Sequence, residues 1–118
     1  MAILKIEERG TTGNRATLAV EGEIDLDTVG VLRQRLDDLQ KRGVDRLVLD
    51  MADTRYVNST ALAVLVKYAE AFKPRGGGIA LARVAPRVKL VFEMLGLLVF
   101  FKFYDTVDAA VAAFDARG

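Results

Sequence analysis

The segment RLVLDM, Arg46–Met51, decides the fold class. Its three consecutive apolar residues, Leu47–Leu49, show no alternation between apolar and polar positions. A strand with one face in water alternates, whereas a continuous short apolar run is typical of a strand covered on both faces. The segment therefore predicts a central strand of a sheet that has helices on both sides.

Downstream of this strand, helical and strand patterns alternate to the end of the chain. The expected elements are a helix from Leu62 to Phe72, a strand Ile79–Val84, a helix opened by Pro86, a last strand Val99–Tyr104 and a helix from Val107 to Phe114 capped by Asp105 or Thr106. Strands that alternate with helices imply right-handed crossovers and a mainly parallel sheet.

Upstream, two strands and one helix are expected. Strands at Ile3–Glu8 and Ala16–Glu21 flank the turn Thr11–Asn14 and predict an antiparallel hairpin. The helix starts near Asp27, and Gly43 ends it; its apolar face is Val29, Leu32, Leu36 and Leu39. The fold class is thus α/β: one domain over residues 1–118, with a mostly parallel mixed sheet of about five strands, an N-terminal antiparallel hairpin and about four helices.

The composition excludes several classes of function. The 118 residues fit one domain, and 52% hydrophobic residues are enough for a core. The chain has no His, Cys or Trp. The ordinary zinc, copper and haem sites, disulfides, thiol nucleophiles and imidazole bases are therefore excluded. We expect no metal and no cofactor.

Charge and hydropathy bear on partners and location. With 17 basic and 16 acidic residues, the net charge of +1 gives no reason to expect nucleic acid or an anionic membrane as a partner. The N-terminus lacks the pattern of a signal peptide. The most apolar run, Leu95–Tyr104, is far shorter than the ~20 residues of a membrane-spanning helix. We expect a soluble, cytoplasmic protein without membrane insertion.

Three patterns have a structural reading beside a functional one. Gly76–Gly78 follows a helix and precedes a strand, so it indicates a helix end and a turn rather than a phosphate-binding loop. Glu23 and Asp25 suggest first a loop in which Asp25 or Asp27 caps the next helix, second a surface contact, and only distantly catalysis. Basic residues prevail between Lys67 and Lys102, either as a patch for an acidic partner or as ordinary solvated faces.

The segment Asn58-Ser59-Thr60 lies where a strand passes into a helix, at the carboxyl edge of the expected sheet. Ligands and functional groups collect at that edge in open α/β sheets. One such residue is explained as a helix cap, whose loss costs about 1 kcal/mol. A phosphate on a first-turn hydroxyl would meet free backbone N–H groups and the positive end of the helix dipole. It would also change the charge of any surface that a partner binds.

The whole chain resembles the STAS domain and, within it, the bacterial anti-sigma factor antagonists. The resemblance rests on VEGEIDLDT (Val20–Thr28), RLVLDM, VNSTALAVLV (Val57–Val66) in place of the family's Asp-Ser-Ser-Gly-Leu signature, GGGIALARVAPRVKLVFEMLGL (Gly76–Leu97) and the final AAVAAF. Each motif is moderately specific, and their order and spacing carry the resemblance.

The resemblance implies a binding switch. In that family the first Ser of the signature is phosphorylated by an anti-sigma factor that is also a serine kinase, and phosphorylation breaks the complex. By position the phosphoacceptor is Ser59, with Thr60 as a neighbour or secondary acceptor and Asn58 as the cap. The implied partner-binding residues are Asp25, Asn58, Ser59, Thr60 and Ala61. The chain would be a substrate of the kinase and not an enzyme.

Two residues depart from the family signature. Asn58 stands where Asp is usual, which removes a negative charge beside the acceptor; electrostatics alone does not fix the sign of the effect on phosphorylation. Ala61 stands where Gly is usual, which favours the helix but adds a methyl group where a partner backbone would approach.

Two other functions stay open. STAS domains also serve as scaffolds in signalling complexes or as accessory subunits of a transport ATPase, without phosphorylation. A small enzyme is the third reading, and it has little support because a site needs a nucleophile, a base and a stabilising group together. We expect a monomer or weak homodimer; the apolar Leu97–Phe103 segment marks a partner or dimer surface if it is not a buried strand.

Overall fold

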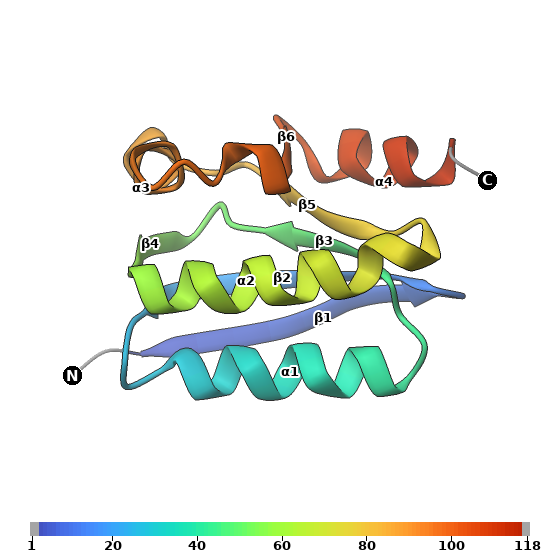
Figure 1. The fold of residues 1–118 in the computed structure, drawn as a ribbon, viewed down its shortest axis with the longest axis horizontal. Helices are drawn as coiled ribbons and strands as arrows, with labels where there is room; N and C mark the ends of the chain where they lie inside the picture. The colour runs from blue at the N-terminus through green and yellow to red at the C-terminus, as the bar shows by residue number, and fades with distance from the viewer. Residues whose placement is uncertain (1–2, 117–118) are drawn as a thin grey trace.

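A mixed sheet with helices on both faces forms the centre of the protein, whose residues 3–116 are described by a computed structural model (Figure 1). Within these residues the strands are β1 Leu4–Thr12, β2 Arg15–Ile24, β3 Arg46–Asp50, β4 Thr54–Val57, β5 Gly78–Ala82 and β6 Lys102–Tyr104. The helices are α1 Val29–Lys41, α2 Ser59–Phe72, α3 Pro86–Met94 and α4 Val107–Asp115, with short 3-10 helices η1 Lys73–Arg75 and η2 Leu98–Phe100.

The strand order is β1-β2-β3-β5-β6, and β4 pairs with the end of β2. β1 and β2 are antiparallel, and all other pairs are parallel. This confirms the expected hairpin followed by a mainly parallel sheet. The carboxyl ends of β2 and β4 meet at one end of the molecule, where α1 and α2 begin (Figure 1).

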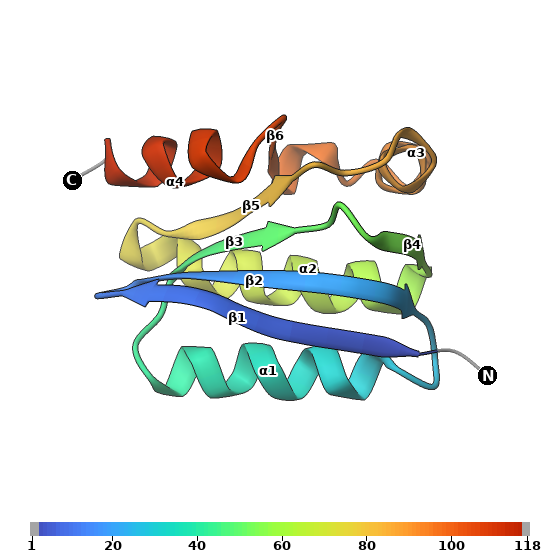
Figure 2. The same cartoon turned by 180° about the vertical axis from the view of Figure 1, so that it is seen from behind.

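Alternate residues of the central strand β3 serve two hydrophobic cores, as expected for a strand covered on both faces. Leu47 and Leu49 belong to the large core, shared with α1, α2 and α3. Val48 faces the other way and packs in a small core with Ala110 and Phe114 of α4. Helix α4 contacts β3, β5 and β6, and within residues 3–116 no helix covers the outer face of β1 and β2, as Figure 2 shows from behind.

The sequence expectation missed one strand and misplaced another. β4 has four residues and no alternation of apolar and polar positions, so its sequence resembles that of a loop. In the structure, three of its residues pair with β2. The expected last strand at Val99–Tyr104 is instead η2 followed by the three-residue β6. Val99 is 87% exposed, while Phe101 is buried and the other apolar residues of the Leu97–Phe103 segment pack against the large core. That segment is therefore mostly core, with Val99 as its exposed point.

The expected helix ends hold. Gly43 and Gly76 adopt the left-handed conformation just after α1 and η1, which confirms the stop signal and the turn reading of the glycine run. At the start of α4, the Thr106 side chain accepts a hydrogen bond from the amide of Ala109 at 3.0 Å, so Thr106 rather than Asp105 is the cap.

Helix α1 also reaches the free edge of the sheet. The amide of Glu23 donates to the carbonyl of Ile3, and the alternation of an antiparallel ladder then turns the carbonyl of Ile6 away from β2. Arg35 of α1 donates to this Ile6 carbonyl at 2.6 Å. No helix within residues 3–116 is long and apolar enough to span a bilayer.

Candidate functional site

The pairing of β4 with β2 brings together two segments that lie far apart in the sequence. Val57 is in register with Ile24, and the amide of Asn58 donates to the Ile24 carbonyl at 3.0 Å. The residues that follow, Asp25 on one side and Asn58 on the other, therefore lie at the same end of the sheet. The structure thus places the two predicted halves of the contact surface next to each other.

Asn58 caps α2, as predicted. Its backbone is extended, and its side-chain oxygen accepts a hydrogen bond from the amide of Ala61 at 2.8 Å. Its carbonyl accepts the first helical bond, from the amide of Leu62 at 3.2 Å. A neutral amide therefore fills the capping position where the resemblance leads one to expect Asp, and the helix start keeps its geometry without a carboxylate.

Ser59 is the first residue of α2 and is exposed, while Thr60 is half-buried. Among residues 3–116, neither hydroxyl has a hydrogen-bond partner, because Asn58 already performs the capping. A free hydroxyl on the first turn lies in the positive potential of the helix N-terminus. The Ser59 hydroxyl is thus accessible to another molecule.

Asp25 shapes the loop that enters α1. Its Oδ1 accepts hydrogen bonds from the amides of Asp27 at 2.9 Å and Thr28 at 3.2 Å. The Thr28 hydroxyl in turn donates to the Glu23 carbonyl at 2.7 Å. Asp25 therefore closes the turn before α1. The expectation that Asp25 or Asp27 caps this helix is wrong, because Thr28 occupies the cap position.

The Glu23 carboxylate lies beside a different group. Its Oε2 is 4.0 Å from Nη2 of Arg55 on β4, and both side chains are exposed. Glu23 and Asp25 thus contact separate partners. Among the described residues, no three carboxylates come close enough together to hold a metal ion.

A family model described as "STAS domain" matches residues 5–110 of this chain. The chain is a member of the STAS domain family.

Known STAS proteins extend this result. The "anti-sigma-B factor antagonist" of Bacillus subtilis (strain 168) is 33% identical over 84 residues, which cover 71% of this chain and 76% of that protein. The anti-sigma factor antagonist SpoIIAA in its unphosphorylated form has the same fold, with a TM-score of 0.82 and 16% identity over 95% of this chain and 97% of that one. The phosphorylated form of the Bacillus protein SpoIIAA gives a TM-score of 0.72 and 15% identity, over 93% and 99% of the two chains.

In this STAS domain, one residue of the expected contact surface is not at the surface. Ala61 is 0% exposed, and its methyl group packs in the large core. The second position after the acceptor on a helix turns about 200° from it, which directs Ala61 toward the sheet. Ala61 therefore cannot contact a partner through its side chain, and its methyl group does not obstruct one.

Two apolar residues at this end of the STAS domain were not singled out from the sequence. Leu26, in the loop before α1, is 74% exposed, and Tyr56 of β4 is 49% exposed. Leu26 lies between Asp25 and Asp27, and an apolar side chain in such a polar loop can be recognised from the sequence as a candidate contact residue. The sequence around Tyr56 contains no comparable indication, because the pattern of β4 does not predict a strand.

Three of the basic residues between Lys67 and Lys102 contact separate partners within the chain. Arg83 pairs with Asp50, and Arg75 Nε lies 3.7 Å from Asp45 Oδ2. Lys89 Nζ lies 4.9 Å from the centre of the Phe103 ring. These contacts lie on different elements, which favours ordinary solvated faces over a surface built for an acidic partner.

Proposed function

We propose that this STAS domain is an anti-sigma factor antagonist, which binds a kinase-type anti-sigma factor and is switched off by phosphorylation at Ser59. The observation that carries the proposal is the free, exposed hydroxyl of Ser59 beside a cap that Asn58 supplies. The curated relative named an anti-sigma-B factor antagonist supports the partner class. SpoIIAA, which has this fold, is known in an unphosphorylated and a phosphorylated form.

The proposed contact surface comprises Asp25, Asn58, Ser59 and Thr60, with Leu26 and Tyr56 at its border. Exposed apolar side chains beside a few polar groups are typical of the surfaces that proteins bury on association. A partner that covers Leu26 and Tyr56 removes water from the Ser59 hydroxyl. The unmodified hydroxyl is small and neutral, so its burial costs little.

Phosphorylation changes this balance. A phosphoserine carries about −1.5 to −2 charges at neutral pH. The first turn of α2 tolerates this charge because the helix dipole and the N–H groups favour an anion there. The partner would have to desolvate the same charge beside Asp25, which is costly unless it is paired. Phosphorylation therefore weakens the complex while the STAS domain itself stays folded.

In this scheme the chain is not an enzyme. The kinase supplies ATP and Mg²⁺, and the STAS domain is its protein substrate. Asn58 retains the cap without the carboxylate of the family signature, so recognition of Ser59 by the kinase would not depend on a charge at position 58.

The test is affinity capture from the source cell's lysate with the parent protein, Ser59→Ala and Ser59→Asp as baits, with and without ATP and Mg²⁺. Without ATP, we expect the parent and Ser59→Ala to retain an anti-sigma factor and Ser59→Asp to lose at least about tenfold in affinity. With ATP and Mg²⁺, the parent should release the anti-sigma factor, whereas Ser59→Ala should still retain it. Mass spectrometry should find phosphate on Ser59 of the parent only.

Thr106→Asp is the matched control, because it also places a carboxylate at an exposed helix start, that of α4. It should bind like the parent. If Ser59→Asp binds equally well, or if no phosphate forms on Ser59 or Thr60, the switch is refuted. Capture of a transport ATPase or of other STAS proteins would then favour the scaffold function.

A further inference from the structure

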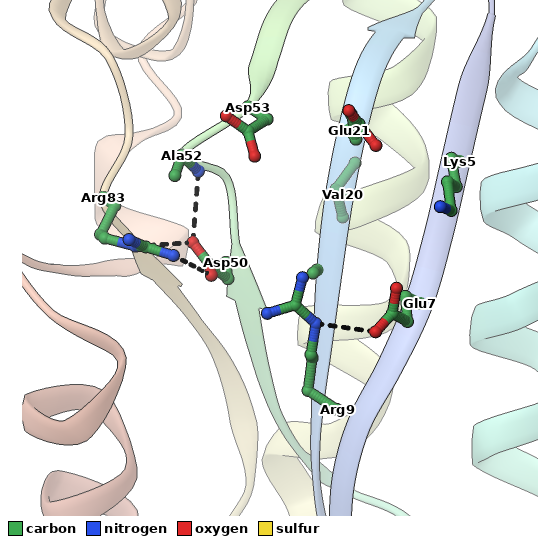
Figure 3. Close-up of a pocket in the computed structure, with 10 residues that line it drawn as sticks. Lys5, Glu7, Arg9, Val20, Glu21, Asp50, Ala52, Asp53 and Arg83 are labelled. Carbon is green, nitrogen blue, oxygen red and sulfur yellow. Dashed lines mark hydrogen bonds and ion pairs between the residues drawn. The ribbon is translucent and has the colours of Figure 1, made fainter.

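Asp50, the last residue of β3, is a buried carboxylate away from the Ser59 surface. It is 6% exposed. Its Oδ1 accepts from the amide of Ala52 at 3.2 Å and from Arg83 Nε at 3.0 Å, and its Oδ2 accepts from Arg83 Nη2, as Figure 3 shows. Burial alone would raise the pKa of Asp50, but the hydrogen bonds from Arg83 and Ala52 outweigh it and hold the pKa below its usual value. Asp50 is therefore ionised at neutral pH.

Arg83 follows β5 in an unusual backbone conformation. Its φ is 58°, and it is the one residue other than glycine with positive φ in the described part of the chain. Residues with a side chain rarely adopt this conformation, because it brings Cβ close to the following carbonyl oxygen. Its amide donates to the Tyr104 carbonyl at 3.0 Å, so both its backbone and its side chain are held. Such conformations persist where the surroundings fix them.

The ion pair joins two loops whose following elements touch each other. The loop after Asp50 leads to β4, and the loop after Arg83 leads to α3. Arg87 of α3 donates through Nε to the carbonyl of Arg55 on β4 at 3.3 Å. The ion pair thus links the two loops from which β4 and α3 leave the sheet.

The position of β4 in turn determines that of the α2 start. β4 is attached to β2 by three register pairs and by the Thr54 hydroxyl, which donates to the Val20 carbonyl at 2.7 Å. Its last residue, Val57, directly precedes the cap Asn58. The turn between β3 and β4 is also held by the amide of Gly22, which donates to the Asp53 carbonyl at 3.0 Å, and a shift of this turn would reach Asn58 through the four residues of β4.

We infer that the Asp50–Arg83 ion pair positions the Ser59 segment by fixing the β3–β4 turn and the start of α3. Asp50 and Arg83 are positioning residues, because neither belongs to the contact surface. The use of this geometry in signalling rests on the proposed function, whereas the geometry itself is tested on this chain alone.

The test is amide hydrogen exchange by NMR on Asp50→Asn and Arg83→Lys. Asp50→Asn keeps the shape but removes the charge, and Arg83→Lys keeps the charge but removes the two-pronged contact. We expect the Ala61 and Leu62 amides, which donate to Asn58, to exchange about tenfold faster in Asp50→Asn, with a smaller increase in Arg83→Lys. The amide of Val44, which follows α1 and donates to the Leu39 carbonyl, should be unchanged.

Arg42→Gln is the control variant, because it removes another ion pair, with Glu8 and Asp38. It should leave Ala61 and Leu62 as in the parent. Equal acceleration at Val44 and Ala61 in Asp50→Asn would indicate general destabilisation and refute the inference. Parental exchange at Ala61 in both variants would also refute it. Neither result depends on whether Ser59 is phosphorylated.

Discussion

The two ends of the sheet differ in how their polar groups are used. At the end where the parallel strands begin, Asn14 Nδ2 donates to Asp45 Oδ1 at 2.9 Å, and the Asp45 carbonyl accepts the amide of Gly78 at 2.9 Å. Arg42 pairs there with Glu8 at 2.8 Å. At the end where the strands finish, the Ser59 hydroxyl is free. Polar groups of the first end bind one another. At the second end Asp50 and Arg83 also pair, but the Ser59 hydroxyl is left available to another molecule.

Contacts that stabilise the fold thus concentrate at one end of the strands, and the proposed contact surface lies at the other. The first end, which we call the tied end, consists of Glu8, Asn14, Arg42, Asp45 and Gly77. The second, the open end, consists of the proposed contact surface with Leu26 and Tyr56. Substitutions at the tied end should therefore affect folding, whereas those at the open end should affect binding more than folding.

Gly77→Ala should break the tied end with the largest effect. A Cβ at Gly77 would lie 1.7 Å from the carbonyl oxygen of Asp45, a backbone atom that cannot move alone. We expect a loss of about 3 kcal/mol in the free energy of unfolding, as for severe overpacking. Urea denaturation measures it. Gly10→Ala is the control, because a Cβ there meets nothing within 4 Å, and it should stay within about 0.5 kcal/mol. Equal losses in the two variants would contradict the steric explanation.

Asn58→Ala tests the open end and should have a smaller effect. It removes the hydrogen bond to the Ala61 amide and should cost about 1 kcal/mol in the free energy of unfolding. Asn58→Asp keeps the cap and adds a negative charge at the helix start, so it should match or exceed the parent by up to about 0.5 kcal/mol. Thermal unfolding of the parent, Asn58→Ala and Asn58→Asp measures these differences in stability. A loss in Asn58→Asp as large as in Asn58→Ala would show that the cap is not what Asn58 contributes.

The smallest effect is expected from the charge of Glu8. Hydrogen bonds from Arg42 and then from the Thr11 hydroxyl lower the pKa of Glu8 from 4.5 to about 2, against a small opposing effect of burial. Because the folded pKa lies below the unfolded one, Glu8 stabilises the fold above about pH 4.5, and this contribution disappears as the pH falls toward 2. In Arg42→Gln the fall in stability over this pH range should be shallower. Urea midpoints at neutral pH and across this range measure it, and identical slopes would refute the assignment.

The sequence predicted the parts of the fold that repeat. The apolar run of β3 and the 3.6-residue spacing of apolar residues in the helices reflect burial. This pattern can be recognised within a single segment of the sequence. The residues alone also predicted that one of Asn58, Ser59 and Thr60 caps the helix, because capping is local chemistry. The assignment of this cap to Asn58 followed from the family resemblance. The switch position Ser59 came from the family resemblance and not from the residues alone.

The rest depends on contacts between distant segments. β4 is a strand only because the end of β2 is beside it, and its own four residues carry no pattern. Asp50 and Arg83 are 33 positions apart and meet because β3 and β5 are neighbours in register. The burial of Ala61 required knowing which side of α2 faces the sheet. Such facts belong to the assembled topology.

The contact between Arg35 and the Ile6 carbonyl has a consequence for aggregation. An open sheet offers its edge strands as templates on which further chains can add, and nine-residue β1 is the longer of the two edges here. A guanidinium that occupies an outward carbonyl in the middle of β1 denies an incoming strand that hydrogen bond. A strand from another chain would have to displace the Arg35 guanidinium before it could form its own hydrogen bonds with β1. Arg35 of the first helix thus hinders the addition of a further strand along β1.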